Sequence, residues 1–97
     1  MSCYYVYVLL SKKDKKFYIG YTSNVHRRLI QHNSGLTKST APRRPFILLY
    51  YECHLSKQDA LRRESYFKSS SGKRTLRQML RESLTLLNYK ASNEGKV

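Results

Sequence analysis

Three stretches of the chain are apolar at nearly every position, and each predicts a β-strand. They are Tyr4–Leu10, Phe17–Tyr21 and Phe46–Cys53. Short continuous runs of aromatic and β-branched residues are typical of strands that are buried on both faces. Only the polar segment Ser11–Lys16, with four lysines, separates the first two stretches, so we expect an antiparallel hairpin with an exposed turn. Because Tyr4–Leu10 is apolar throughout, it is predicted to be a central strand.

The segment after the hairpin predicts a helix over Asn24–Ser34. Residues of the kind that cap helix N-termini stand at its start, apolar residues follow at helical spacing, and Gly35 provides a C-terminal stop. The next segment, Leu36–Pro45, is predicted to be a loop, because its two prolines disfavour regular structure.

Two more helices are predicted in the last third of the chain. Ser56 and Asp59 form a variant capping box, with aspartate in place of glutamate, for a helix that ends near Ser69. After a break at Ser69–Gly72, a stripe of leucines at helical spacing predicts an amphipathic helix over Lys73–Leu87. The element order is therefore β-β-α-β-α-α.

Length and composition indicate one packed domain. The chain has 97 residues and a hydrophobic share of 40%, so we expect a domain over residues 1–87 and a disordered tail over 88–97. Its apolar runs are too short to span a membrane, and its N-terminus lacks the pattern of a secretory signal. We therefore expect a cytoplasmic protein, in which Cys3 and Cys53 are small buried hydrophobic residues in a reducing setting.

Charge indicates the class of partner. Lys and Arg total 19 against 6 for Asp and Glu, which gives a formal net charge of +13. This excess favours nucleic acid as the partner, with a membrane surface second. The basic residues are spread over several elements, which indicates a basic face on a folded body. Those expected to hold nucleic acid are Lys12, Lys13, Lys15, Lys16, Arg27, Arg43, Arg44, Lys68, Lys73 and Arg74.

Five side chains form a candidate catalytic set. Tyr7 and Tyr18 lie in the hairpin, and Arg28 and His32 are four residues apart on one helix face. Glu64 is an acid on an otherwise basic helix. Each also has a simpler interpretation: strand tyrosines are usually structural, an Arg–His pair at this spacing usually faces solvent, and Glu64 can neutralise Lys68 one turn later.

Taken together, these groups fit phosphodiester cleavage. A tyrosine hydroxyl can serve as acid, base or hydrogen-bond donor, and a guanidinium can bind two phosphate oxygens at once. A carboxylate can hold Mg²⁺ beside a substrate phosphate. The remaining acids form no evident cluster in the sequence, which argues against a site with two metal ions.

The stretches around these residues resemble the GIY-YIG nucleases. The similarity covers about residues 3–82 and is greatest to the small single-domain bacterial branch grouped as UPF0213 or YhbQ-like, also called URI-domain endonuclease-like proteins. It implies an α+β fold, in which a small three-stranded antiparallel sheet is flanked by helices. The matching residues are Tyr5-Val6-Tyr7, Tyr18-Ile19-Gly20-Tyr21-Thr22-Ser23-Asn24, Arg27-Arg28-Leu29-Ile30-Gln31-His32-Asn33 and Ala60-Leu61-Arg62-Arg63-Glu64 with Lys68.

The resemblance also implies roles for single residues. It implies DNA cleavage through one Mg²⁺ or Mn²⁺ ion held by Glu64, with Arg28 stabilising the charge on the phosphate. Tyr7 and Tyr18 match the tyrosines of the two half-motifs, one of which helps to activate the attacking water. His32 stands where the family places His or Tyr. The glycine Gly20 suggests a bulge or a close approach to the strand, and the resemblance implies that substrate makes that approach.

Two positions depart from the family pattern. Tyr5 replaces the glycine of the first half-motif, and Asn88 is the late candidate for an asparagine that DNA-cutting members often carry. Without an accessory DNA-binding domain, we expect an endonuclease of repair or recombination with weak sequence specificity, acting on DNA that is branched or nicked. Two alternatives stay open: a nucleic-acid-binding module without turnover, and a nuclease subunit that needs a protein partner. The oligomeric state is left open.

Overall fold

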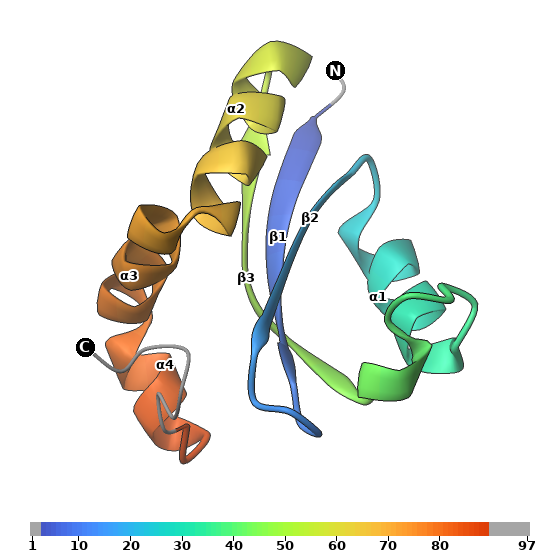
Figure 1. The fold of residues 1–97 in the computed structure, drawn as a ribbon. Helices are drawn as coiled ribbons and strands as arrows, with labels where there is room; N and C mark the ends of the chain where they lie inside the picture. Colours follow the sequence, from blue (N-terminus) through green and yellow to red (C-terminus); the bar gives the residue numbers. More distant parts are fainter. Residues whose placement is uncertain (1–2, 90–97) are drawn as a thin grey trace.

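A three-stranded antiparallel sheet forms the centre of the molecule (Figure 1). The computed structural model describes residues 3–89. The central strand is β1 (Tyr4–Ser11), with β2 (Phe17–Thr22) on one side and β3 (Phe46–His54) on the other. Residues Val6 to Leu10 are at most 2% exposed, so the prediction of a central strand buried on both faces is confirmed, as is the hairpin of β1 and β2.

Helices cover both faces of the sheet, as Figure 1 shows, and the α+β fold class is confirmed. One face carries α1 (Val25–Ser34), and the other carries α2 (Lys57–Lys68), α3 (Ser70–Met79) and α4 (Arg81–Leu86). The helix α1 begins and ends as predicted, because the Asn24 side chain accepts a hydrogen bond from the backbone of the first turn and the following Gly35 adopts a left-handed φ of 84°. No helix within residues 3–89 has the length and hydropathy that a membrane crossing requires.

The last predicted helix, Lys73–Leu87, is wrong in two respects. The break that precedes it is confined to Ser69, whose hydroxyl accepts the Gly72 N–H at 3.0 Å and caps α3. A second break falls at Leu80, with φ −106° and ψ 19°, and separates α3 from α4. Leu80 is buried in the core, so tertiary packing sets this break, and no glycine or proline marks it in the sequence.

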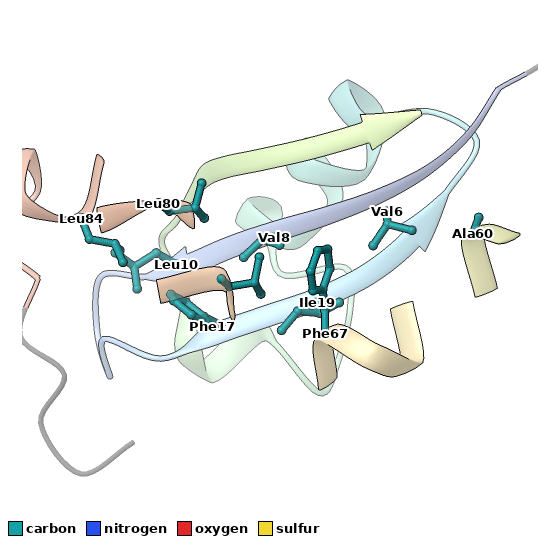
Figure 2. Close-up of a cluster of buried hydrophobic side chains, with 10 residues drawn as sticks. Val6, Val8, Leu10, Phe17, Ile19, Ala60, Phe67, Leu80 and Leu84 are labelled. Carbon is teal, nitrogen blue, oxygen red and sulfur yellow. The ribbon is translucent and has the colours of Figure 1, made fainter. Parts of the chain in front are cut away.

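Alternation along β1 divides the core into two parts, because successive side chains point to opposite faces of a sheet. Even-numbered residues of β1 pack against α2, α3 and α4 in the larger cluster, and Tyr7 and Leu9 pack with Phe46 in a smaller one on the α1 side. Figure 2 shows the larger cluster, which consists of Val6, Val8, Leu10, Phe17, Ile19, Ala60, Phe67, Leu76, Leu80 and Leu84.

The predicted tail, residues 88–97, lies outside the described residues from position 90 onward. Within the described part, Tyr89 stacks on Phe17 with ring centroids 5.8 Å apart. The packed domain therefore reaches at least to Tyr89. Asn88 has a φ of 56° directly after α4, and its N–H bonds the Thr85 carbonyl, so it acts as a left-handed residue that ends the helix.

The segment predicted as a loop, Leu36–Pro45, contains one turn of 3-10 helix, η1 (Ala41–Arg43). The expectation that the prolines disfavour regular structure fails only for this turn, because proline is tolerated at the first positions of a helix. Arg43 holds η1 to the β1–β2 turn: its Nε lies 2.6 Å from Asp14 Oδ2, and its Nη2 donates to the carbonyl of Phe17 at 3.2 Å.

Cys3 and Cys53 form a disulfide, with Cα atoms 5.6 Å apart. The prediction that both are free, buried thiols was wrong. Antiparallel pairing sets Tyr5 of β1 opposite Cys53 of β3. Cys3 lies two residues before Tyr5, so this register brings the two cysteines within bonding range. The bond joins residues 50 positions apart, so it restricts the unfolded chain strongly.

Reduction of this disulfide is expected to lower the free energy of unfolding by about 2–4 kcal/mol, because the reduced unfolded chain regains the entropy of a long loop. Urea denaturation with and without dithiothreitol measures the change, and the Cys53→Ser variant serves as a permanently reduced form. The variant should match the reduced wild-type protein and be insensitive to dithiothreitol. Equal midpoints for oxidised and reduced wild-type protein would contradict the prediction.

Candidate active site

Tyr7 of β1 points toward α1, and its side chain passes over Gly20 of the neighbouring strand β2. The sheet register pairs Tyr7 with Gly20 of β2, and a Cβ atom built on Gly20 would collide with the phenol oxygen and ring of Tyr7. The close approach predicted at Gly20 is therefore present, without a bulge in the β1–β2 register, and the group that approaches is Tyr7. Glycine at this position lets the Tyr7 hydroxyl lie over the neighbouring strand.

A directed chain of hydrogen bonds fixes the Tyr7 hydroxyl. Thr40 donates to the Thr37 carbonyl, so its oxygen accepts the Nδ1 proton of His32 at 2.8 Å. The Nε2 atom of His32 is then unprotonated and accepts the Tyr7 hydroxyl proton at 3.0 Å. Arg28 Nε donates to the Tyr7 oxygen at 3.4 Å. The chain therefore runs from the Arg28 guanidinium to the Thr37 carbonyl through three neutral side chains, those of Tyr7, His32 and Thr40.

Burial sets the protonation of this pair. His32 has no exposed surface, and burial, followed by the charge of Arg28, lowers its pKa to about 4. Burial also raises the pKa of Tyr7 to about 12, although the hydrogen bond from Arg28 opposes the change. At neutral pH the shared proton therefore lies on Tyr7, and both side chains are uncharged. The interpretation of Arg28 and His32 as a solvent-facing pair fails for His32.

The buried His32 predicts a loss of stability in mild acid. Its pKa is about 4 in the folded protein and near 6.5 when unfolded, so the unfolded chain binds more protons between these values. The free energy of unfolding should fall as the pH drops from 6.5 to about 4, by on the order of 3 kcal/mol in total. Urea midpoints across this range, for wild type and His32→Gln, measure the effect. An equally steep fall in both proteins would refute this assignment to His32.

Tyr18 forms the partly exposed side of the same cluster. Its ring packs edge-on against His32, with centroids 4.8 Å apart, and lies 6.3 Å from the Tyr7 ring. Arg28 interacts with both tyrosines, and its hydrogen bond to Tyr7, more than its contact with Tyr18, raises its pKa. The two motif tyrosines therefore differ, since one is buried and the other is accessible to solvent.

Glu64 lies on α2, which covers the face of the sheet opposite α1. Its charge raises the pKa of Tyr7, which places the carboxylate within electrostatic range of the phenol. Glu64 also forms an ion pair with Lys68, with Oε2 and Nζ 3.1 Å apart, and its side chain is 19% exposed. The simpler interpretation, neutralisation of Lys68 one turn later, therefore describes a real contact.

The donor set suits a metal that takes few protein ligands. Within residues 3–89, no three His, Cys, Asp or Glu side chains gather as ligands. A divalent ion here would have one protein carboxylate, that of Glu64, and would take its other ligands from water and phosphate. Mg²⁺ is commonly bound in this way, so the residues present fit a single-metal site.

The predicted nucleic-acid contacts lie in separate parts of the surface. The exposed lysines of the β1–β2 turn lie near Arg44, Arg27 is exposed on α1, and Lys68, Lys73 and Arg74 belong to α2 and α3 on the other side of the sheet. Arg43 is occupied by Asp14 and backbone carbonyls, so its guanidinium supports the fold. Asn88 follows α4, on the sheet face opposite Tyr7.

Two residues to which the sequence assigned no role support the site. Thr40 is 1% exposed and orients His32, and Gln31 accepts a hydrogen bond from Arg28 Nη1 at 3.0 Å. The spacing of Gln31, three residues after Arg28 on a helix, could have indicated that contact. Thr40 lies in the segment between α1 and β3, where no periodicity reveals its contact with His32.

Comparisons with known proteins identify the family of the chain. The sequence profile of the GIY-YIG catalytic domain matches residues 3–78. A UPF0213 protein of Staphylococcus haemolyticus is 42% identical over 78 residues, which cover 79% of this chain and 94% of that protein. One from Bacillus licheniformis is 38% identical over 92 residues, covering 94% of each. The solution NMR structure of a UPF0213 protein from Bacillus halodurans is 34% identical, with a TM-score of 0.44 over 95% of this chain and 92% of that one.

Proposed function

Because the chain belongs to the GIY-YIG family and to its UPF0213 group, we propose that it is a divalent-metal-dependent DNA endonuclease. The observation that carries the proposal is the hydrogen-bonded chain from Arg28 through Tyr7 to His32. It fixes a permanently charged guanidinium beside an accessible tyrosine, and the charge of the Glu64 carboxylate acts on Tyr7 of the same chain. Phosphodiester hydrolysis needs activation of the attacking water and stabilisation of the charge that builds up on the phosphate, and side chains of these three kinds can supply both.

Arg28 stabilises the phosphate in this proposal. Its Nε is held by Tyr7 and its Nη1 by Gln31, so the guanidinium plane is fixed before substrate arrives. A fixed donor costs no reorganisation during the reaction, and this is why preorganised charges stabilise transition states effectively. Tyr7 and His32 act through Arg28 and are therefore positioning residues.

Tyr18 is the tyrosine that meets the attacking water. Tyr7 is 2% exposed and keeps its proton, because burial raises its pKa to about 12 and its hydroxyl already donates to His32. Tyr18 is partly exposed and lies beside Arg28. Of the two half-motif tyrosines, Tyr18 is therefore the better placed to orient water or to exchange a proton with it.

Glu64 is the residue that would hold Mg²⁺ or Mn²⁺. A bound divalent ion would supply positive charge to the phosphate oxygens and lower the pKa of a coordinated water. Lys68 has to release or share the carboxylate for this to happen, since it contacts Oε2 of Glu64. Phosphate of the substrate is an alternative partner for the Lys68 ammonium.

The surrounding basic residues supply affinity for the DNA backbone. Phosphate contacts fix position and carry no sequence information, so cleavage should show weak sequence preference and binding should weaken steeply with salt. We place the activity in repair or recombination, on DNA that is branched or nicked. Such substrates offer a distorted backbone to a protein that cannot read base sequence.

The test is cleavage of branched, nicked, duplex and single-stranded DNA with Mg²⁺, with Mn²⁺ and with EDTA. The proposal predicts cutting that requires the metal and favours branched or nicked DNA. A second function, nucleic-acid binding without turnover, is favoured by the Lys68–Glu64 ion pair, because that pair already neutralises the carboxylate. Binding that persists in EDTA, with no cutting at any metal concentration, would select this second function. Cutting that requires a second protein would identify a nuclease subunit.

A further inference from the structure

A hollow of about 490 Å³ opens beside the candidate site, between β1, β3 and the start of α1. Tyr5 and Tyr51 form one wall, with ring centroids 5.8 Å apart and ring planes at 65°. Leu29 and Leu48 supply apolar surface, and His26 adds a polar group from the first turn of α1. Tyr51 is 52% exposed, so its ring is accessible to a ligand.

The hollow adjoins the residues that the proposed function uses. Tyr5 and Tyr7 are two positions apart on β1, so their side chains point to the same face of the sheet. Leu29, which lines the hollow, follows Arg28 directly on α1. A nucleotide whose phosphate contacts Arg28 would therefore carry its base, or that of its neighbour, toward Tyr5.

We propose that this hollow binds an unstacked nucleobase of the DNA substrate, with Tyr5 and Tyr51 as the aromatic surfaces against which the base packs. The inference rests on the proposed function and adds a substrate feature to it. Aromatic side chains in a positively charged setting are the usual binding surface for bases of single strands, because every base has a π-face. Arg27 is exposed beside the hollow, and the chain carries a net charge of +13.

Tyr5 supplies half of the aromatic wall of the hollow. Its ring packs edge-on against Tyr51, so the aromatic wall depends on both side chains. The lining combines polar residues, Ser23, Asn24 and His26, with the apolar Leu29 and Leu48, which suits a planar heterocycle with polar edges. A base inside a regular duplex cannot enter, so substrates with unpaired bases beside the cut should be preferred.

The test is equilibrium binding without cleavage. Fluorescence anisotropy in EDTA compares a single-stranded oligonucleotide with an abasic strand of equal length and charge. The wild-type protein should bind the base-carrying strand about tenfold more tightly. Tyr51→Leu should remove this preference, Tyr51→Phe should keep it, and Tyr66→Leu, at another exposed tyrosine on α2, should bind like wild type.

Each outcome separates the pocket from the proposed function. Equal wild-type affinity for both strands would overturn the nucleobase pocket and leave the nuclease proposal intact. Failure to bind either strand would contradict the proposed function itself. A wild-type dimer that Tyr51→Leu dissociates, in sedimentation without DNA, would show that a second copy of the chain occupies this face, and the pocket would be rejected.

Discussion

Replacing Arg28 by alanine is expected to lower the rate of DNA cleavage by about 10²–10³-fold, because the site loses the fixed charge that faces the reacting phosphate. The fold should survive, since Arg28 is only partly buried and Tyr7 keeps its hydrogen bond to His32. Single-turnover cleavage at saturating protein measures the effect apart from DNA affinity. Circular dichroism and urea midpoints check that the variant is folded.

Two further variants make this result specific. Arg28→Lys keeps the positive charge, but the lysine ammonium lacks the planar guanidinium that can bind Tyr7 and two phosphate oxygens at the same time. This variant should therefore recover little of the activity. Arg27→Ala removes an exposed charge from the neighbouring position and should weaken binding slightly at unchanged saturated rate. Equal losses in Arg27→Ala and Arg28→Ala would show that both residues serve only as general attraction for DNA.

Gly20→Ala is expected to damage stability and activity together. The new methyl group would overlap the Tyr7 ring and hydroxyl, which cannot retreat freely because Tyr7 is buried and bonded to His32. Overpacking of this kind costs about 1–3 kcal/mol of unfolding free energy. Displacement of the Tyr7 hydroxyl would also remove the support of Arg28, so cleavage should fall by at least about tenfold.

A double-variant cycle tests the cause. Tyr7→Leu shortens the side chain that Gly20→Ala meets, so the alanine should cost much less stability in that background. Urea denaturation of the four proteins gives the coupling energy between the two positions. If Gly20→Ala lowers stability equally with tyrosine or leucine at position 7, the damage comes from the strand backbone and not from contact with Tyr7.

The sheet and most helices could be predicted because their signals are local. Unbroken apolar runs identify the strands, and Asn24 and Ser56 cap the helices that follow them. The break at Leu80 and the disulfide could not be predicted in the same way. The first depends on how α3 and α4 pack on the sheet, and the second depends on the register of β3 against β1.

The sequence also indicated which residues meet near α1, but not how they differ. Tyr7 and Tyr18 occupy equivalent places in their half-motifs, and only burial separates a protonated, bonded phenol from one that faces solvent. The orientation of His32 depends on Thr40, whose place is fixed by the segment that returns from α1 to β3. Burial and side-chain orientation both depend on tertiary contacts. The sequence pattern could therefore identify the site residues but not the role of each one.

The central claim is that Glu64 makes this site a metal-dependent nuclease. The most direct measurement is cleavage of branched DNA over a Mg²⁺ titration by wild type, by Glu64→Gln and by Glu82→Gln, an acid whose side chain is 90% exposed on α4. Binding in EDTA is measured alongside. The account predicts that wild type and Glu82→Gln cut only with metal, and that Glu64→Gln binds DNA yet cuts at least about 10²-fold more slowly at every Mg²⁺ concentration. Cleavage by Glu64→Gln at the wild-type rate would contradict it.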